Sequence, residues 1–124
     1  MTTVPIQKNY IIYQGALFEE VFEWFAQDGV TPIDMTGYTI RMQVRPSLTA
    51  TVKILDLTTE NNKITITDAA QGQFKIRVDA EETAELTPIK NAVYDLEIDP
   101  GNDENIIRLL EGTITIKGEV TRDD

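Results

Sequence analysis

The sequence is 124 residues long and has neither cysteine nor histidine, which excludes disulfides, thiol nucleophiles, imidazole acid–base chemistry and the common zinc sites. Acidic residues outnumber basic residues by 21 to 11, and the net charge of −10 disfavours nucleic acid and anionic membranes as partners. Residues 1–10 lack the basic-then-apolar pattern of a secretion signal, and no apolar stretch could span a bilayer. We therefore expect one domain over residues 1–124, made in the cytoplasm.

The first quarter of the chain has strand patterns. Aromatic and β-branched residues at 10–13 are typical of a strand, and residues 17–25 can form a second strand with two faces at period two. The alternation places one set of side chains on a single face: Phe18, Glu20, Phe22 and Trp24. The same segment also has apolar residues at every fourth position, as a short helix would. Its aromatic residues and the Asp28-Gly29 turn signal that follows favour a strand.

The next segments alternate more cleanly. Residues 38–45 predict a half-buried strand that ends at Pro46. Its inward side chains are expected to be Tyr38, Ile40, Met42 and Val44. After a polar loop, residues 52–57 and 64–66 predict two short strands, joined by an asparagine-rich turn at 60–63.

The second half of the chain continues with strands and contains the only convincing helix. Residues 73–78 predict a strand, and residues 79–86 predict a helix of about two turns that Asp79 can cap. Residues 91–98 and 106–116 predict two further strands, the second with a bulge or break at Glu111-Gly112.

These elements predict the class of fold. Roughly seven to nine short strands, with turns about every 8–12 residues, are typical of a sandwich. We expect a mainly β protein, an antiparallel β-sandwich of immunoglobulin-like or jelly-roll-like type with one short helix. Residues 1–13 are either an ordinary first strand or an N-terminal arm that reaches a neighbouring subunit.

Carboxylates are the only abundant groups that could act in catalysis. Glu19, Glu20 and Glu23 flank Trp24, which resembles a glycosidase acid pair beside a sugar-stacking ring. Strand periodicity, however, places Glu19 and Glu23 on the face opposite Glu20 and Trp24. We therefore expect solvated strand positions and no catalytic pair.

Other candidate sites are weaker. Asp99, Asn102, Asp103 and Glu104 could supply oxygen ligands to Ca²⁺, but their spacing differs from that of an EF-hand, and the Pro100-Gly101 turn alone explains the composition. Three helical glutamates predict a solvated helix face: Glu81, Glu82 and Glu85. Lys53 and Lys90 could be reactive amines, but no neighbouring residue singles them out. We therefore assign no catalytic, metal-binding or cofactor-binding residue and no cofactor, and we predict a protein that is not an enzyme.

Tyr94 has a candidate structural role. A tyrosine that enters a late strand of a sandwich often donates its hydroxyl to the preceding loop, as in a tyrosine corner. Here that loop is residues 86–88. The alternative is an ordinary core tyrosine.

The C-terminal third has a recognisable order of motifs. YDLE at 94–97, RLLEG at 108–112 and EVTR at 119–122 follow one another, after an upstream DMTGYTIRMQVR at 34–45. This order resembles that of small bacteriophage tail- or baseplate-associated structural proteins. The resemblance implies a non-enzymatic adaptor or accessory subunit in the virion, assembled in the host cytoplasm. It also implies a homo-oligomer that docks on other virion proteins.

Two other functions remain open. An acidic inhibitor could mimic nucleic acid, although Arg41, Arg45, Arg77 and Arg108 would interrupt a continuous acidic face. A carbohydrate-binding module could use Trp24, Tyr38 or Tyr94 as a stacking platform.

Overall fold

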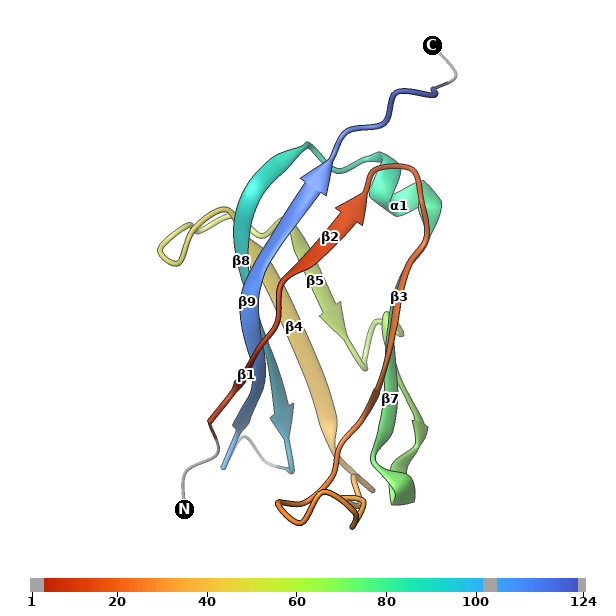
Figure 1. Ribbon diagram of the computed structural model, residues 1–124, viewed down its shortest axis with the longest axis vertical. Helices are drawn as coiled ribbons and strands as arrows, with labels where there is room; N and C mark the ends of the chain where they lie inside the picture. The colour runs from red at the N-terminus through yellow and green to blue at the C-terminus, as the bar shows by residue number, and fades with distance from the viewer. Residues whose placement is uncertain (1–3, 102–104, 123–124) are drawn as a thin grey trace.

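The computed structural model describes residues 4–101 and 105–122, which form two β-sheets packed face to face (Figure 1). The large sheet contains β1 (Ile6–Gln7), β2 (Tyr10–Tyr13), β4 (Thr39–Arg45), β5 (Leu55–Thr58), β8 (Ile89–Asp99) and β9 (Ile107–Lys117). The small sheet contains β3 (Phe18–Glu23), β6 (Ile64–Asp68) and β7 (Gln73–Val78). The mainly β sandwich expected from the sequence is therefore confirmed.

The strand order identifies the type of sandwich. The small sheet has the order β3-β7-β6, and the large sheet has the order β1-β9-β8-β4-β5, with β2 also paired to β9. In chain order this is the B-E-D sheet and the G-F-C-C′ sheet of an immunoglobulin-like domain, rather than a jelly roll. Neighbouring strands are antiparallel, except that β1 and β2 run parallel to β9.

The core follows from the period-two alternation of the strands. Met42 of β4, Phe74 of β7 and Leu96 of β8 are almost completely buried between the two sheets. Each such side chain stabilises the fold by roughly 1.5–3 kcal/mol through removal of its surface from water. Of the inward positions expected on residues 38–45, Ile40, Met42 and Val44 are buried as predicted, whereas Tyr38 is only partly buried.

Two β-bulges adjust the pairing of β8 with β9. The sequence predicts a bulge or break at Glu111-Gly112, but neither bulge lies there. Gly112 pairs in register with Tyr94, and a Cβ atom at this position would collide with the carbonyl of Lys8. One bulge instead lies at Leu109, which allows Leu109 and the adjacent Leu110 both to be buried. The other lies near Asn91, whose φ of 57° is tolerated better by asparagine than by most residues.

Several predicted boundaries are corrected. β5 begins at Leu55 because the preceding loop extends through Val52, which is 66% exposed. Residues 6–13 contribute β1 and β2 to the large sheet, so they do not form a detached arm. The helix α1 (Ala80–Ala84) is shorter than predicted, and the side chain of Asp79 makes no capping bond because its carboxylate accepts a hydrogen bond from Arg77.

Polar contacts tie α1 to the strands at one end of the sandwich. The Thr83 hydroxyl is buried and donates to the carbonyl of Ala16, at 2.8 Å. The Gln14 side-chain amide donates to the carbonyl of Leu86 and accepts from the backbone N–H of Glu119. Neither α1 nor the 3₁₀ turn η1 (Ala69–Gln71) is long and apolar enough to cross a membrane, and the described residues contain no longer helix.

Candidate functional site

The glutamates around Trp24 are divided between the two faces of β3. Glu19 and Glu23 lie on the outer side of β3, whereas Glu20 lies on the inner side with Phe22. Glu19 accepts a hydrogen bond from Arg77 at 2.9 Å. The separation onto two faces that the alternation predicts is therefore confirmed.

The candidate calcium loop can be followed only in part. A carboxylate oxygen of Asp99 accepts the backbone N–H of Gly101 at 2.9 Å, which forms a local turn. Asn102, Asp103 and Glu104 lie outside the described residues. Among residues 4–101 and 105–122, no group of three or more His, Cys, Asp or Glu side chains is arranged to hold a metal ion.

The remaining charged candidates lie apart from one another. Glu81 on α1 and Glu85 just after its end are exposed, as predicted, but Glu82 is half-buried and pairs with Lys63 at 2.5 Å. Lys53 pairs with Asp56 at 3.3 Å, and Lys90 is exposed on β8.

Tyr94 makes a different contact from the predicted one. Its hydroxyl donates to the carbonyl of Lys8 at 2.6 Å and not to residues 86–88. The tyrosine-corner prediction is therefore wrong in its partner, because Tyr94 lies opposite Gly112 and next to the junction of β1 and β2. The contact ties the middle of the large sheet to its N-terminal edge.

Of the three aromatic residues considered as carbohydrate platforms, only Tyr94 belongs to the interior. Tyr94 is 5% exposed, and its ring packs against that of Tyr10 at 5.8 Å between centroids. Trp24 and Tyr38 are partly buried and pack against the core cluster. A sugar-stacking platform needs an open ring face, which the buried ring of Tyr94 cannot offer.

One surface feature is a hollow of about 590 Å³ on the outer face of the large sheet. β1, β4, β8 and β9 form its floor, and the loop between β4 and β5, at residues 46–54, forms one rim. Arg45 holds this loop by donating to the carbonyl of Ala50 at 3.0 Å. Leu48, at the loop's tip, is 87% exposed and lines the hollow. Figure 1 shows this loop projecting away from the body of the sandwich. We call this feature the outer-face hollow.

The lining of the outer-face hollow is balanced in charge. Two arginines, Arg45 and Arg108, face two carboxylates, Asp95 and Glu111. Arg108 lies 3.5 Å from Asp95 and 3.4 Å from Glu111. Beside the hollow, Arg41 and Glu97 form a further neutral pair at 3.2 Å.

The side chains in the hollow are partly desolvated. Burial raises the pKa of Asp95, and the neighbouring charge of Glu97 adds to this effect. Arg108 opposes the shift, but it does not cancel it. A carboxylate in this state can accept a donor from a docking surface, because its present ion pair is long and half-exposed.

The sequence contained little signal for this surface. The outward set on β4 and β8 is visible in the alternation, and arginines occur on several of the predicted strands. However, the hollow also depends on the projecting loop and on β1 lying beside β9, which is a contact across about 104 residues. Local patterns do not carry such pairings.

Comparison with known proteins identifies a fold and no family. No family model and no curated protein matches the sequence. Among solved structures, a chicken TCR superposes with a TM-score of 0.55 at 8% identity, over 94% of this chain and 57% of that chain. The chain therefore has an immunoglobulin-like fold. It spans a little over half the length of the matched chain, and identity this low shows the fold alone.

Proposed function

We propose that the chain is a non-enzymatic structural subunit of a bacteriophage particle, an adaptor or accessory protein of the tail or baseplate. It works by docking the outer face of the large sheet onto copies of itself and onto neighbouring virion proteins. The order of the YDLE, RLLEG and EVTR motifs, which resembles that of small bacteriophage structural proteins, supports the virion assignment, and the balanced charge of the outer-face hollow, within a chain of net charge −10, supports docking through this face.

Charge balance matters because copies of an acidic protein repel one another. Two molecules of net charge −10 meet most easily through a patch that adds no net charge of its own. The outer-face hollow has two positive and two negative side chains, and the adjoining Arg41–Glu97 pair is also neutral. In a two-fold contact, the arginines of one copy can face the carboxylates of the other.

The local geometry also suits docking. The ion pairs of the hollow are partly exposed and therefore contribute little stability to the isolated chain. They can exchange partners at small cost when a second surface arrives. Leu48 offers an exposed apolar contact at the rim, of the kind that becomes buried when an interface closes.

The assignment to a virion is tested on particles. Mass spectrometry of purified phage from the strain that encodes this chain should detect the protein in stoichiometric amounts. Its absence from infectious, purified particles would contradict the virion assignment.

The docking surface is tested by charge reversal with a matched control. Arg108→Glu changes the hollow by two charge units, whereas Arg77→Glu makes the same change on the small sheet. The two arginines are matched, since their side chains are 51% and 48% exposed and each pairs with two carboxylates. We expect Arg108→Glu to weaken self-association by about tenfold or more in light scattering, and Arg77→Glu to leave it nearly unchanged.

Equal weakening by the two variants would mean that only net charge matters, and it would refute docking through the hollow. A wild-type chain that stays monomeric at millimolar concentration would refute self-docking.

A further inference from the structure

A second surface of the molecule is the free edge of β3. All six residues of β3 pair with β7, from Phe18 opposite Val78 to Glu23 opposite Gln73. No strand of the described residues pairs with the other edge of β3, because β1 and β2 are both paired to β9 in the large sheet. The edge thus presents backbone donors and acceptors that an added strand could use.

Apolar side chains lie on both sides of this edge. Val21, on the outer side of β3, is 67% exposed, and Leu17, which comes just before β3, is 49% exposed. On the inner side, Phe22 stacks on Phe74 with centroids 4.9 Å apart and stays partly uncovered. An extended segment placed here would cover apolar surface on both faces of the sheet.

The large sheet extends beyond the small sheet on the same side. Its order contains five strands across, against three in the small sheet. Ile6 pairs with the inward-facing Leu110, yet it is 58% exposed, and Val4 is 80% exposed. Tyr10 of β2 packs on Phe18 of β3 at 5.8 Å, so β3 begins beside β2, which pairs with the same strand, β9, as β1 does. A fourth strand on β3 would extend the small sheet towards the uncovered inner side of β1.

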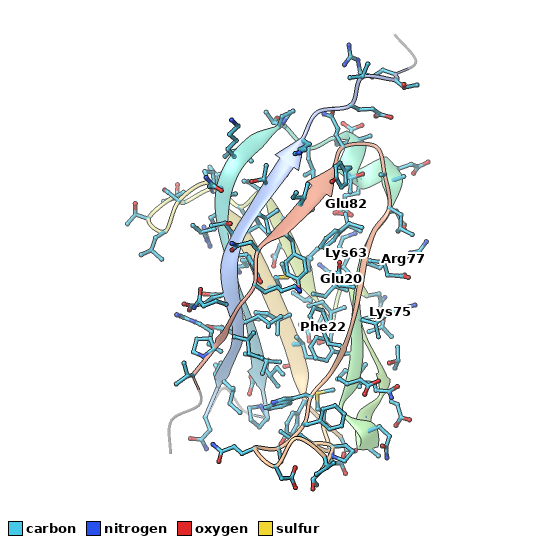
Figure 2. The ribbon with its side chains drawn as sticks, viewed as in Figure 1. Glu20, Phe22, Lys63, Lys75, Arg77 and Glu82 are labelled. Atoms are coloured by element: carbon cyan, nitrogen blue, oxygen red, sulfur yellow. The ribbon has the colours of Figure 1, made fainter. Side chains whose placement is uncertain are left out.

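The charge on the edge specifies the kind of segment. Glu20 is half-buried on the inner side of β3, and neither it nor Glu23 has a hydrogen-bonded or ion-paired side-chain partner among the described residues. By contrast, Arg77 already holds Glu19 and Asp79. In Figure 2 the labelled Glu20 and Phe22 lie between the sheets, whereas Lys75 and Arg77 project away from them. The cations of β7 therefore do not neutralise Glu20.

The same charge excludes a second copy as the occupant. An antiparallel pairing of two β3 edges would bring Glu19, Glu20 and Glu23 of each copy close together, and like charges across strands are destabilising. An inward-pointing charge on an edge strand is a common protection against self-pairing. It leaves the edge open to a segment that carries the opposite charge.

We propose that the free edge of β3 binds an extended basic segment of another polypeptide as a fourth strand of the small sheet. A Lys or Arg of that segment lies opposite Glu20, and apolar residues two positions away on either side cover Phe18 and Phe22. The segment belongs to a protein other than this chain. The proposal adds a second contact to the proposed docking function, but it does not depend on the outer-face hollow.

A short peptide tests this directly. The probe is the capped peptide Ser-Thr-Val-Thr-Lys-Thr-Val-Thr-Ser, which places Val, Lys and Val on one side of a strand. Titrated to millimolar concentration into isotope-labelled protein, it should shift the backbone amide signals of residues 17–24 and protect β3 from hydrogen exchange. A peptide with Pro replacing the Thr that follows Lys should not bind, because Pro cannot continue the hydrogen-bond ladder.

Charge exchange tests the role of Glu20. Glu20→Lys should weaken binding of the Lys peptide by about tenfold. The same variant should bind a peptide that carries Glu in place of Lys more tightly than the wild-type protein does. Glu81→Lys, at an exposed position of α1, makes the same change in net charge and should leave binding of the Lys peptide within about twofold. Thermal melting establishes that each variant is folded.

Several outcomes would overturn the proposal. These are no shift at β3 at millimolar peptide, equal effects of Glu20→Lys and Glu81→Lys, and tight binding of the Pro peptide. Arg108→Glu should leave peptide binding unchanged, so failure at β3 is distinguishable from failure of the outer-face hollow.

Discussion

Replacing Tyr94 with Phe should destabilise the fold through the loss of one hydroxyl. The hydroxyl is buried and donates to the carbonyl of Lys8 at 2.6 Å, at the junction of β1 and β2. Phe keeps the ring and its packing but leaves that carbonyl without this donor. Loss of a buried hydrogen bond costs about 1–2 kcal/mol, which lowers the Tm of a domain of this size by roughly 4–8 °C.

Urea unfolding provides the assay. Trp24 is the only tryptophan, so its fluorescence reports on the transition. The midpoint should fall without a change in slope, since little additional surface is exposed. Tyr13→Phe is the control, because Tyr13 is 55% exposed, and its midpoint should stay within about 0.5 kcal/mol of the wild type. A Tyr94→Phe midpoint equal to that of the wild type would refute the reasoning.

The same residue predicts an alkaline dependence. Burial raises the pKa of Tyr94 above its ordinary value, and burial, together with the charge of Glu20, raises the pKa of Tyr10 to about 12. A raised folded-state pKa means that the stabilisation is complete below the unfolded value of about 10 and is lost as pH rises through the folded value. The free energy of unfolding of the wild type should therefore decline above pH of about 10. The difference in free energy of unfolding between the wild type and Tyr94→Phe should narrow over the same range. A constant gap up to pH of about 12 would contradict this assignment.

Three further substitutions test other contacts. Gly72→Ala should cost at least about 2 kcal/mol in urea unfolding, because φ is +68° and a Cβ would lie 2.5 Å from the carbonyl oxygen of Trp24; a neutral result would contradict this geometry. Thr83→Val should cost about 1–2 kcal/mol, with faster hydrogen exchange in α1, through loss of the bond to Ala16, and unchanged exchange would count against that bond. Asp95→Asn should raise the Tm at neutral pH, because burial raises the pKa of Asp95 and so disfavours its charged form in the folded state. The gain in Tm should vanish below pH of about 4, where the Asp95 carboxyl is protonated in both states. A lower Tm of the variant at neutral pH would oppose this explanation.

Much of the interior could be predicted because alternation is a local signal. A strand repeats every two residues, so Met42 and Phe74 are recognisable as inward from their neighbours alone. The same rule placed Glu20 on the inner side of β3. It could not show that β3 is an edge strand, because that depends on where β1 and β2 pair.

The missed features are contacts between distant parts of the chain. Tyr94 contacts Lys8 across 86 residues, and Gln7 contacts Glu111 across 104. The requirement for glycine at position 112 comes from the approach of Lys8 and not from a bulge. The predicted strand at 52–57 was placed too early because Val52 has β propensity, although it lies in a projecting loop with no partner strand.

The parallel pairing of β1 and β2 with β9 also determines how the molecule would carry tension. The chain enters β1 at one end of the long axis and leaves β9 at the opposite end (Figure 1). A pull between Ile6 and Lys117 would load the ladder in shear, so that many of its hydrogen bonds would have to break together instead of peeling one by one.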